Sequence, residues 1–131
     1  IETVGVSNVN EIAQALDALL PKVDALYEPT DNLVASAMPL IAEKSIANKK
    51  AVITGEKGMV EAGGLATEGI DYYELGKQTG EMAIKVLKGE KPNTLAIKTL
   101  EKTELVINMK TLNALGLTLP ADLDKKATKV E

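Results

Sequence analysis

The sequence contains no cysteine, histidine, tryptophan or phenylalanine, and three tyrosines are its only aromatic residues. Without cysteine, disulfide bonds and thiol chemistry are excluded. Without histidine as well, the common zinc sites, the Ser-His and Cys-His nucleophilic systems and imidazole acid–base catalysis are excluded together. We therefore expect a protein that is not an enzyme and that carries no metal ion and no cofactor.

Arginine is also absent, so the fifteen cations are all lysines, scattered among nineteen acidic residues to give a net charge of −4. A surface of this kind is a poor match for nucleic acid, which is not expected as a partner. Hydrophobic residues make up 45% and charged residues 26% of the 131 residues, which is typical of one globular domain.

Long hydrophobic runs are missing too, so the sequence predicts no membrane-spanning helix. The chain starts at Ile1 in a strand-like pattern, with no basic and apolar leader before it. We expect that further residues precede Ile1 in the parent protein, where an export signal could lie.

Short β-branched segments alternate with helical patterns through the first half of the chain, and Pro39 is expected to kink or split the second helical run. This alternation predicts parallel strands with right-handed helical crossovers, a doubly wound α/β sheet. The strands are expected at residues 1–6, 23–28, 51–54 and 65–70.

The second half is expected to open with an amphipathic helix over 72–88, capped by Asp71. Two further strands are predicted at 95–100 and 104–109, as a hairpin through Glu101, Lys102 and Thr103. A short helix should end at Gly116, and a polar, frayed tail should begin at Ala121.

Polar residues gather where the predicted strands end. Because parallel strands present their carboxyl ends at one edge of a sheet, and ligands bind in the crevice beyond it, these residues are candidate ligand contacts. They are Thr30, Asp31 and Asn32 after the second strand, Gly55 and Glu56 after the third, and Asp71 and Tyr72 after the fourth.

Each candidate also has a plain structural interpretation. Asp31, Asn32 and Asp71 open helices, where they would cap free backbone N–H groups. Glu56 could be a solvated loop acid. Either tyrosine of the pair Tyr72 and Tyr73 could be in the core while the other faces the cleft. The glycines of residues 55–64 form no recognised phosphate-binding pattern.

Four segments, spread along nearly the whole chain, carry a resemblance to a known family: VSNVNEIAQAL, DALYEPTDNLVASAMP, TGEKGMVEAGGLATEGIDYYELGKQTGEMAIKVLKGEKP and LVINMKTLNALGL. They resemble the carboxyl-terminal half of substrate-binding proteins of ABC importers, in the group associated with tryptophan, tyrosine and related ligands. The PTDN turn, the MVEAG run and the GIDYYELG crossover are specific in combination, whereas each alone is weak.

The resemblance implies part of a type I periplasmic-binding-protein fold, in which two α/β lobes close on a ligand. It implies that the seven candidate residues lie near the ligand, an amino-acid-like and possibly aromatic molecule. It also implies an extracytoplasmic location, as a periplasmic protein or a tethered lipoprotein, and a partner permease.

The same resemblance divides the chain. Residues 1–70 would form a ligand-binding lobe without its first βα unit, and 71–92 a crossover helix of the other lobe. Residues 93–120 would be the returning strands and short helix, and 121–131 the polar tail. The chain has no arginine, so no guanidinium group is present that could bind a ligand carboxylate through two hydrogen bonds.

Two other functions fit such a sequence less well. The effector-binding core of a transcriptional repressor can share this fold, and an upstream helix-turn-helix would indicate it. The other is an enzyme of flavodoxin-like or receiver type. A receiver would need clustered acids after its first strand plus an acceptor aspartate, and Ser7 and Asn8, which stand there, do not supply them. Because most of the second lobe is absent, the helix over 72–88 is expected to self-associate, to swap into a second copy or to fold back onto its own sheet.

Overall fold

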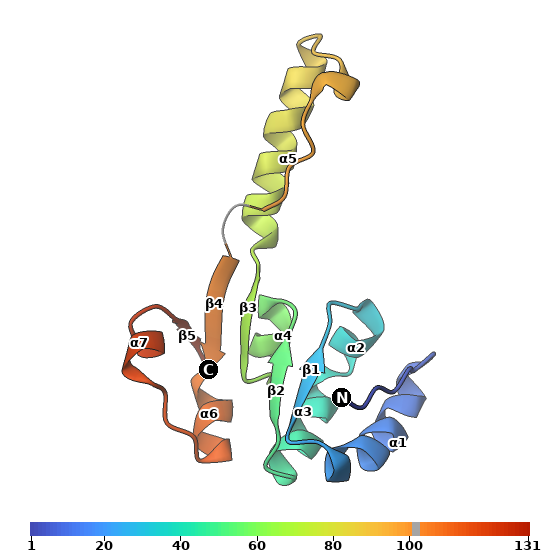
Figure 1. Ribbon diagram of the computed structural model, residues 1–131, viewed down its shortest axis with the longest axis vertical. Coiled ribbons are helices and arrows are strands. Elements are labelled where there is room, and N and C mark those ends of the chain that lie inside the picture. The colour runs from blue at the N-terminus through green and yellow to red at the C-terminus, as the bar shows by residue number, and fades with distance from the viewer. Residues whose placement is uncertain (101–102) are drawn as a thin grey trace.

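A five-stranded sheet in the order β1-β2-β3-β4-β5 runs through the body of the molecule (Figure 1). The computed structural model describes residues 1–100 and 103–131. The strands are β1 (Ala25–Glu28), β2 (Ala51–Thr54), β3 (Ala66–Ile70), β4 (Thr103–Asn108) and β5 (Thr128–Val130).

The strands β1, β2 and β3 are parallel, as the alternation of strands and helices predicts. Strand β4 instead runs antiparallel to β3, and β5 is parallel to β4. The α/β class is confirmed, but the sheet is mixed because the chain leaves β3 and re-enters β4 at the same end, which reverses its direction (Figure 1).

Helices from the first half of the chain pack on one face of the sheet and form the main core with Leu26 of β1 and Val52 of β2. Pro39 stands at the second position of a new helix after a break at Ala37, so the predicted split at this proline is confirmed. The helices are α1 (Val9–Leu19), η1 (Leu20–Lys22), α2 (Asn32–Ser36), α3 (Met38–Ala47) and α4 (Lys57–Glu61).

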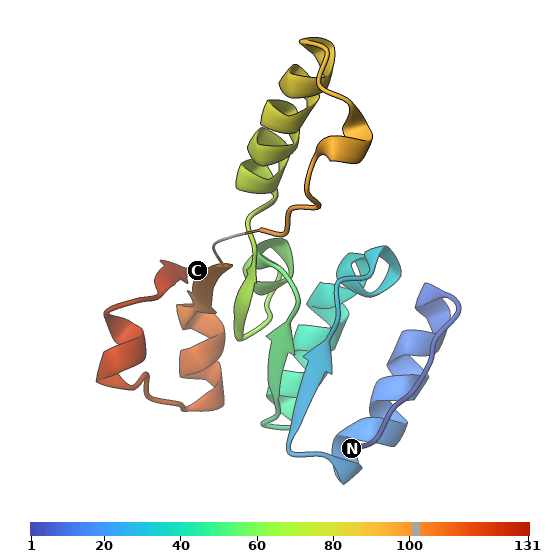
Figure 2. The ribbon, with the colours of Figure 1, turned by 45° about the horizontal axis from the view of Figure 1, so that its top comes forward.

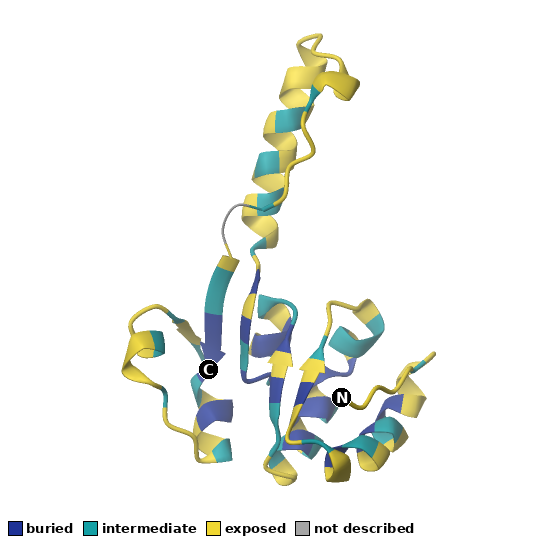
Figure 3. Cartoon of the chain, viewed as in Figure 1, coloured by how far each residue is buried: buried dark blue, intermediate teal, exposed yellow. Residues whose placement is uncertain are grey.

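The opposite face of the sheet is open at β1 and β2. Side chains alternate between the two faces of a strand, so Tyr27 and Ile53 point away from the core that holds Leu26 and Val52. The exposed fractions are 67% for Tyr27 and 38% for Ile53, and Figure 3 shows exposed stretches beside buried ones along β1 and β2.

Residues 1–6 do not form the predicted strand. They run along α1 (Figure 2), and only Val6 among them packs against the core. The ladder of β1 is with β2, and its other edge carries no ladder to residues 1–6. β-Branched residues favour a strand only where a partner strand is present, which accounts for the difference.

Helix α5 (Tyr72–Leu87) projects away from the sheet, and the chain returns beside it through η2 (Pro92–Thr94), as Figures 1 and 2 show. We call residues 72–100 the arm. No residue of α5 is buried, so the expectation that this helix folds back onto its own sheet is wrong.

The predicted strand over 95–100 is also absent, because this segment lies along α5 and not along a strand. The Gln78 side-chain amide donates to the Thr99 carbonyl across the arm, at 3.2 Å. Of the predicted hairpin turn, Glu101 and Lys102 lie outside the described residues.

The carboxyl-terminal residues are more ordered than the sequence predicts. Helix α6 (Met109–Leu115) ends as expected at Gly116, which has a left-handed φ of 72°. Helix α7 (Ala121–Asp124) and strand β5 then replace the expected frayed tail, and β5 pairs with β4. The Thr128 hydroxyl donates to the Glu104 carboxylate at 2.7 Å, which helps to hold β5 in place.

Within residues 1–100 and 103–131, no helix combines the length and apolar character needed to cross a membrane.

Candidate functional site

The turns after β1 and β2 pack directly against each other at the carboxyl edge of the sheet. The Gly55 N–H donates to the Glu28 carbonyl at 2.9 Å, which extends the β1–β2 ladder by one bond. A Cβ added at Gly55 would lie 2.5 Å from Thr30 Oγ1 and 2.7 Å from the Thr30 backbone nitrogen. Only glycine therefore fits there, and Thr30 and Gly55 are brought together as the sequence predicts.

The turn after β3 joins the same edge. Glu56 forms an isolated parallel bridge with Ile70, the residue before Asp71. A Cβ at Gly69 would lie 2.9 Å from the Gly55 carbonyl oxygen and 3.1 Å from Glu56 Cα. The backbones of the second and third turns are thus in contact, so the candidates after all three parallel strands share one edge.

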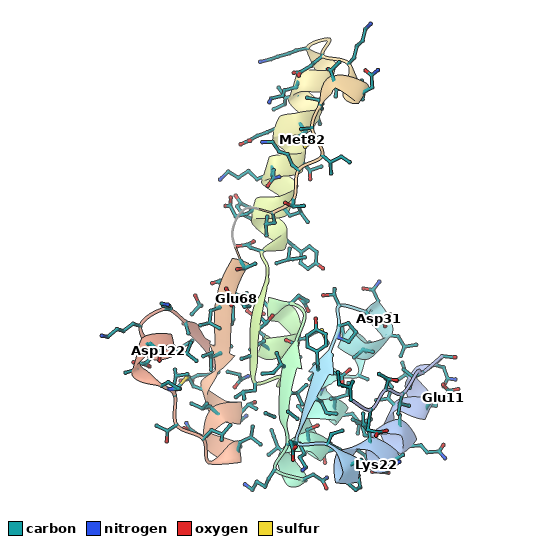
Figure 4. The ribbon with its side chains drawn as sticks, in the orientation of Figure 1. Glu11, Lys22, Asp31, Glu68, Met82 and Asp122 are labelled. Carbon is teal, nitrogen blue, oxygen red and sulfur yellow. The ribbon has the colours of Figure 1, made fainter. Side chains whose placement is uncertain are left out.

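The three candidate carboxylates all cap helices. Asp31 accepts from the N–H groups of Leu33 and Val34 at 2.8 and 3.1 Å, where α2 begins (Figure 4). Asp71 does the same at the start of α5, at 2.9 and 3.2 Å. The capping interpretation of both is confirmed, and a carboxylate oxygen retains further acceptor capacity for a ligand.

Glu56 is also a cap, which the sequence did not indicate. Its two carboxylate oxygens accept from Gly58 N–H at 2.8 Å and Met59 N–H at 2.9 Å. The solvated-loop interpretation of Glu56 is therefore wrong. The signal available in the sequence is weak because α4 is only five residues long.

Both members of the tyrosine pair are accessible. Tyr72 is 52% exposed and Tyr73 is 79% exposed, so neither belongs to the core. The core alternative therefore applies to neither tyrosine, because α5 leaves the body of the protein at this point. Asn32, the last candidate, is exposed at the first position of α2.

Glu28 is a functional candidate that sequence reasoning missed. It is the last residue of β1, is half-buried, and lines the same cavity as Asp31. Burial disfavours the charged form and raises the pKa of the Glu28 carboxyl above its usual value. No sequence pattern marks it, because its burial depends on segments that are distant along the chain.

That cavity has a volume of about 1030 Å³ and lies between residues 1–6, α1 and the free edge of β1. A second cavity of about 440 Å³ lies at the base of the arm, and its lining includes Asp71, Gln78, Lys98 and Glu104. Among the described residues, no group of three or more histidine, cysteine, aspartate or glutamate side chains could hold a metal ion. The edge offers carboxylates, hydroxyls and tyrosine rings, which suit hydrogen bonding and stacking with a small polar molecule.

Comparison with known proteins shows which family the chain resembles. The model of the family described as "ABC transporter substrate binding protein" matches residues 1–131. A tyrosine-binding protein of Clostridioides difficile is 44% identical over 113 residues, which are 86% of this chain and 33% of that protein.

Solved structures agree with this result. A protein from Streptococcus pneumoniae in complex with L-Trp is 38% identical, with a TM-score of 0.88 over 99% of this chain and 44% of the other. A ligand-free, open substrate-binding protein with adhesive properties from Clostridium difficile is 41% identical, with a TM-score of 0.78 over 98% of this chain and 43% of the other. The chain spans less than half the length of these relatives, and it belongs to the family of ABC transporter substrate-binding proteins.

Proposed function

We propose that this chain forms part of the solute-binding component of an ABC importer and that its ligand is an amino acid, preferably an aromatic one. The observation that carries the proposal is the convergence of three polar turns at the carboxyl edge of the parallel strands, in a chain that belongs to a substrate-binding family. The relatives that are named for tyrosine or solved with L-Trp support the choice of ligand class.

The ligand-binding edge consists of Thr30, Asp31, Asn32, Gly55, Glu56, Asp71 and Tyr72. Asp31 has the best position for a ligand ammonium group, because it is exposed and lines the large cavity next to Glu28. Tyr72 offers an exposed ring for stacking on an aromatic side chain. With no arginine in the chain, a ligand carboxylate would be bound by backbone N–H groups, a lysine or the second lobe.

The helical part of the arm, α5, belongs on this proposal to the second lobe. Residues 1–70 would supply one wall of the cleft and residues 71–92 would cross to the opposite wall, with 93–120 returning to the first lobe. The absence of burial along α5 supports this division, because an amphipathic helix this long is normally covered by a partner. The remaining finer proposals are an extracytoplasmic location, a partner permease, and a purely binding role without catalysis.

The effector-binding core of a repressor remains an alternative with the same edge. The family match and the named relatives favour the importer. A helix-turn-helix in the parent protein would favour the repressor.

The binding proposal can be tested on this chain with 5-fluoro-L-tryptophan, observed by ¹⁹F NMR, which detects weak binding. One wall of a cleft supplies part of the contacts, so we expect a Kd of about 1 mM, corresponding to roughly −4 kcal/mol. L-Tryptophan and L-tyrosine should displace the probe, whereas L-lysine should not.

Asp31→Asn separates the two roles of this carboxylate, because asparagine caps a helix as well as aspartate but carries no charge. A ligand ammonium group would lose a charge-assisted hydrogen bond, so the affinity should fall by about 1.5 to 3 kcal/mol with little change in stability. Equal affinity in the variant would show that Asp31 is only a cap. Absence of any ¹⁹F change at high protein concentration would contradict the aromatic ligand itself.

A further inference from the structure

Helix α4, which begins at the ligand-binding edge, is held at both of its ends by side chains. At its start, the Glu56 carboxylate accepts from Gly58 N–H at 2.8 Å and from Met59 N–H at 2.9 Å. A helix of five residues is not stable by itself in water, because the cost of its nucleation exceeds what so few backbone hydrogen bonds return. The position of α4, and with it the position of the Glu56 turn, therefore depends on contacts with the rest of the protein.

The end of α4 is held by two buried side chains from the far end of β4 and from α6. Asn108 Nδ2 donates to the Val60 carbonyl at 2.9 Å, and Thr111 Oγ1 donates to the Gly63 carbonyl at 3.0 Å. The last carbonyls of a helix have no partner within it, so they need donors of this kind. Because Val60 is buried as well, its carbonyl could not turn to water if the Asn108 donor were lost.

The same Asn108 amide also begins the next helix. Its Oδ1 accepts from the Thr111 N–H at 2.9 Å, which caps α6. Only one orientation of the amide satisfies both partners, because the Val60 carbonyl needs a donor and the Thr111 N–H needs an acceptor. The Asn108 backbone N–H donates to the Leu65 carbonyl at 2.9 Å, directly before β3. One buried residue thus fixes α4, α6 and the start of β3 relative to one another.

A second polar contact between α4 and β4 is weaker. Lys57 Nζ lies 3.6 Å from Glu104 Oε2, and the two side chains are exposed to 42% and 31%. Ion pairs that are this accessible to water contribute little, because water screens them and competes for both groups. Asn108 is 3% exposed, so its hydrogen bond to α4 is protected from this competition. Of the two contacts, the Asn108 amide is therefore the one that holds the helix.

The opposite end of α4 is tightly packed into the ligand-binding edge. Helix α4 lies against β2, β3 and β4 (Figure 1). A Cβ added at Gly69 would lie 3.1 Å from Glu56 Cα, and Thr54 Oγ1 donates to the Glu56 carbonyl at 3.1 Å. A displacement of the buried end of so short a helix is therefore passed on to the Glu56 turn. Asn108 itself is buried and does not reach a ligand at the exposed edge.

We propose that Asn108 is a positioning residue of the ligand-binding edge, which acts on the ligand through α4 and the Glu56 turn. Its amide fixes the buried end of the helix, and the helix sets where Glu56 stands relative to Thr30. The inference rests on the proposed function, because it requires an amino acid ligand at this edge.

Asn108→Asp tests the role, because aspartate keeps the shape and the acceptor for the Thr111 N–H. At about pH 8, well above the ordinary aspartate pKa, the carboxylate has no hydrogen to donate to the Val60 carbonyl. Two quantities are measured on the ¹⁵N-labelled chain: the ligand-free amide shifts of Gly58 and Met59, which report the Glu56 cap, and the Kd of 5-fluoro-L-tryptophan. We expect both amide signals to move and the Kd to rise by about two- to thirtyfold, the usual range for residues that modulate binding without touching the ligand.

Two further variants separate positioning from a general loss of stability. Ile12→Val shortens a buried side chain of α1 and should unfold at lower urea concentration, with the Kd and the Gly58 and Met59 signals of the wild type. Thr111→Val keeps the N–H that Asn108 caps but lacks the hydroxyl that bonds the Gly63 carbonyl. It should change the same signals and the Kd in the same direction, and it decides the question if Asn108→Asp fails to fold.

Unchanged Gly58 and Met59 signals in both positioning variants would overturn the proposal, and so would moved signals with the Kd of the wild type. An equal loss of affinity in Ile12→Val would also overturn it, because general loosening of the protein would then account for the effect. If the wild-type chain does not bind the probe, the proposed function is contradicted instead. The ligand-free signals of Gly58 and Met59 then still decide whether Asn108 positions the Glu56 turn.

Discussion

At the scale of single residues, Gly55 fixes the distance between the first two turns of the ligand edge. A methyl group there would overlap with Thr30 from both its side chain and its backbone. We expect Gly55→Ala to lower the free energy of unfolding by about 1 to 3 kcal/mol, the usual cost of overpacking. Urea unfolding measures this change.

The matched control is Gly76→Ala in the middle of α5, where an added Cβ has no neighbour within 4 Å. Alanine is the better helix former, so this variant should be neutral or stabilising by up to about 1 kcal/mol. Equal unfolding curves for Gly55→Ala and the wild type would show that the two turns are not in contact.

The half-buried Glu28 carboxyl makes the stability of the folded protein depend on pH, and the direction of this dependence follows from its raised pKa. Its folded pKa is raised by burial, so the native state binds more protons than the unfolded state between the usual glutamate value of about 4.3 and the raised value. The stability contributed by Glu28 therefore falls as the pH rises through this window and stays low at neutral pH.

Glu28→Gln removes this ionisation. The variant should be more stable than the wild type at pH 7, and the difference should vanish below about pH 4, where the glutamate is protonated in both states. Thermal unfolding across the pH range measures it. Glu43→Gln, at an exposed position of α3, controls for the loss of one negative charge from an acidic protein. A Glu28→Gln variant that is less stable than the wild type at pH 7 would contradict the desolvation argument.

Residue roles were predictable where the signal is local. Asp31 and Asp71 each stand immediately before a helical pattern, so their capping role follows from the sequence alone. Glu56 was misjudged because its helix has only five residues, and Glu28 was missed because its burial arises from contacts that no local pattern records.

At the scale of elements, the arm is the exposed part of the molecule that most needs a partner. Figure 4 shows Met82 midway along it, far from the sheet. Ile84 is 51% exposed, Leu87 86% and Ile97 96%. Exposed apolar groups of this density on one projecting element are typical of an interaction surface.

We therefore predict that the chain self-associates through α5 when no second lobe is present. Analytical ultracentrifugation from micromolar to millimolar concentration should show a concentration-dependent oligomer. The double variant Ile84→Lys and Leu87→Lys should be monomeric, because lysine side chains would have to be desolvated in the contact. Leu117→Lys, at an exposed leucine outside the arm, is the control and should associate like the wild type. A wild-type chain that remains monomeric at millimolar concentration would contradict this prediction.

Elements were predicted correctly where the pattern was long or marked by proline, as for α5 and the break before Pro39. The failures concern β-structure. Residues 1–6 and 95–100 have strand-forming sequences but lack a neighbouring strand, whereas Thr128–Val130 forms β5 because β4 offers an edge. In these three segments, the presence of a neighbouring strand and not the β-propensity of the sequence determined whether a strand formed.

At the scale of the whole molecule, the sequence indicated the α/β class and the convergence of the strand ends, because both follow from alternating strands and helices. The antiparallel entry of β4 could not be predicted in the same way. It depends on the arm leaving and returning at one end of the sheet, so that β4 pairs with β3 in the antiparallel direction, and no local sequence pattern records this.

The central claim is that the turns after β1, β2 and β3 form one ligand-binding edge for an amino acid. The most direct test is a titration of the ¹⁵N-labelled chain with L-tryptophan, observed through its amide chemical shifts. The account predicts shifts that saturate together at residues 28–32, 55–56 and 69–72, while α6 and β5 remain unchanged. Saturating shifts confined to α6, β5 or the tip of the arm, or no shifts at millimolar L-tryptophan, would contradict it.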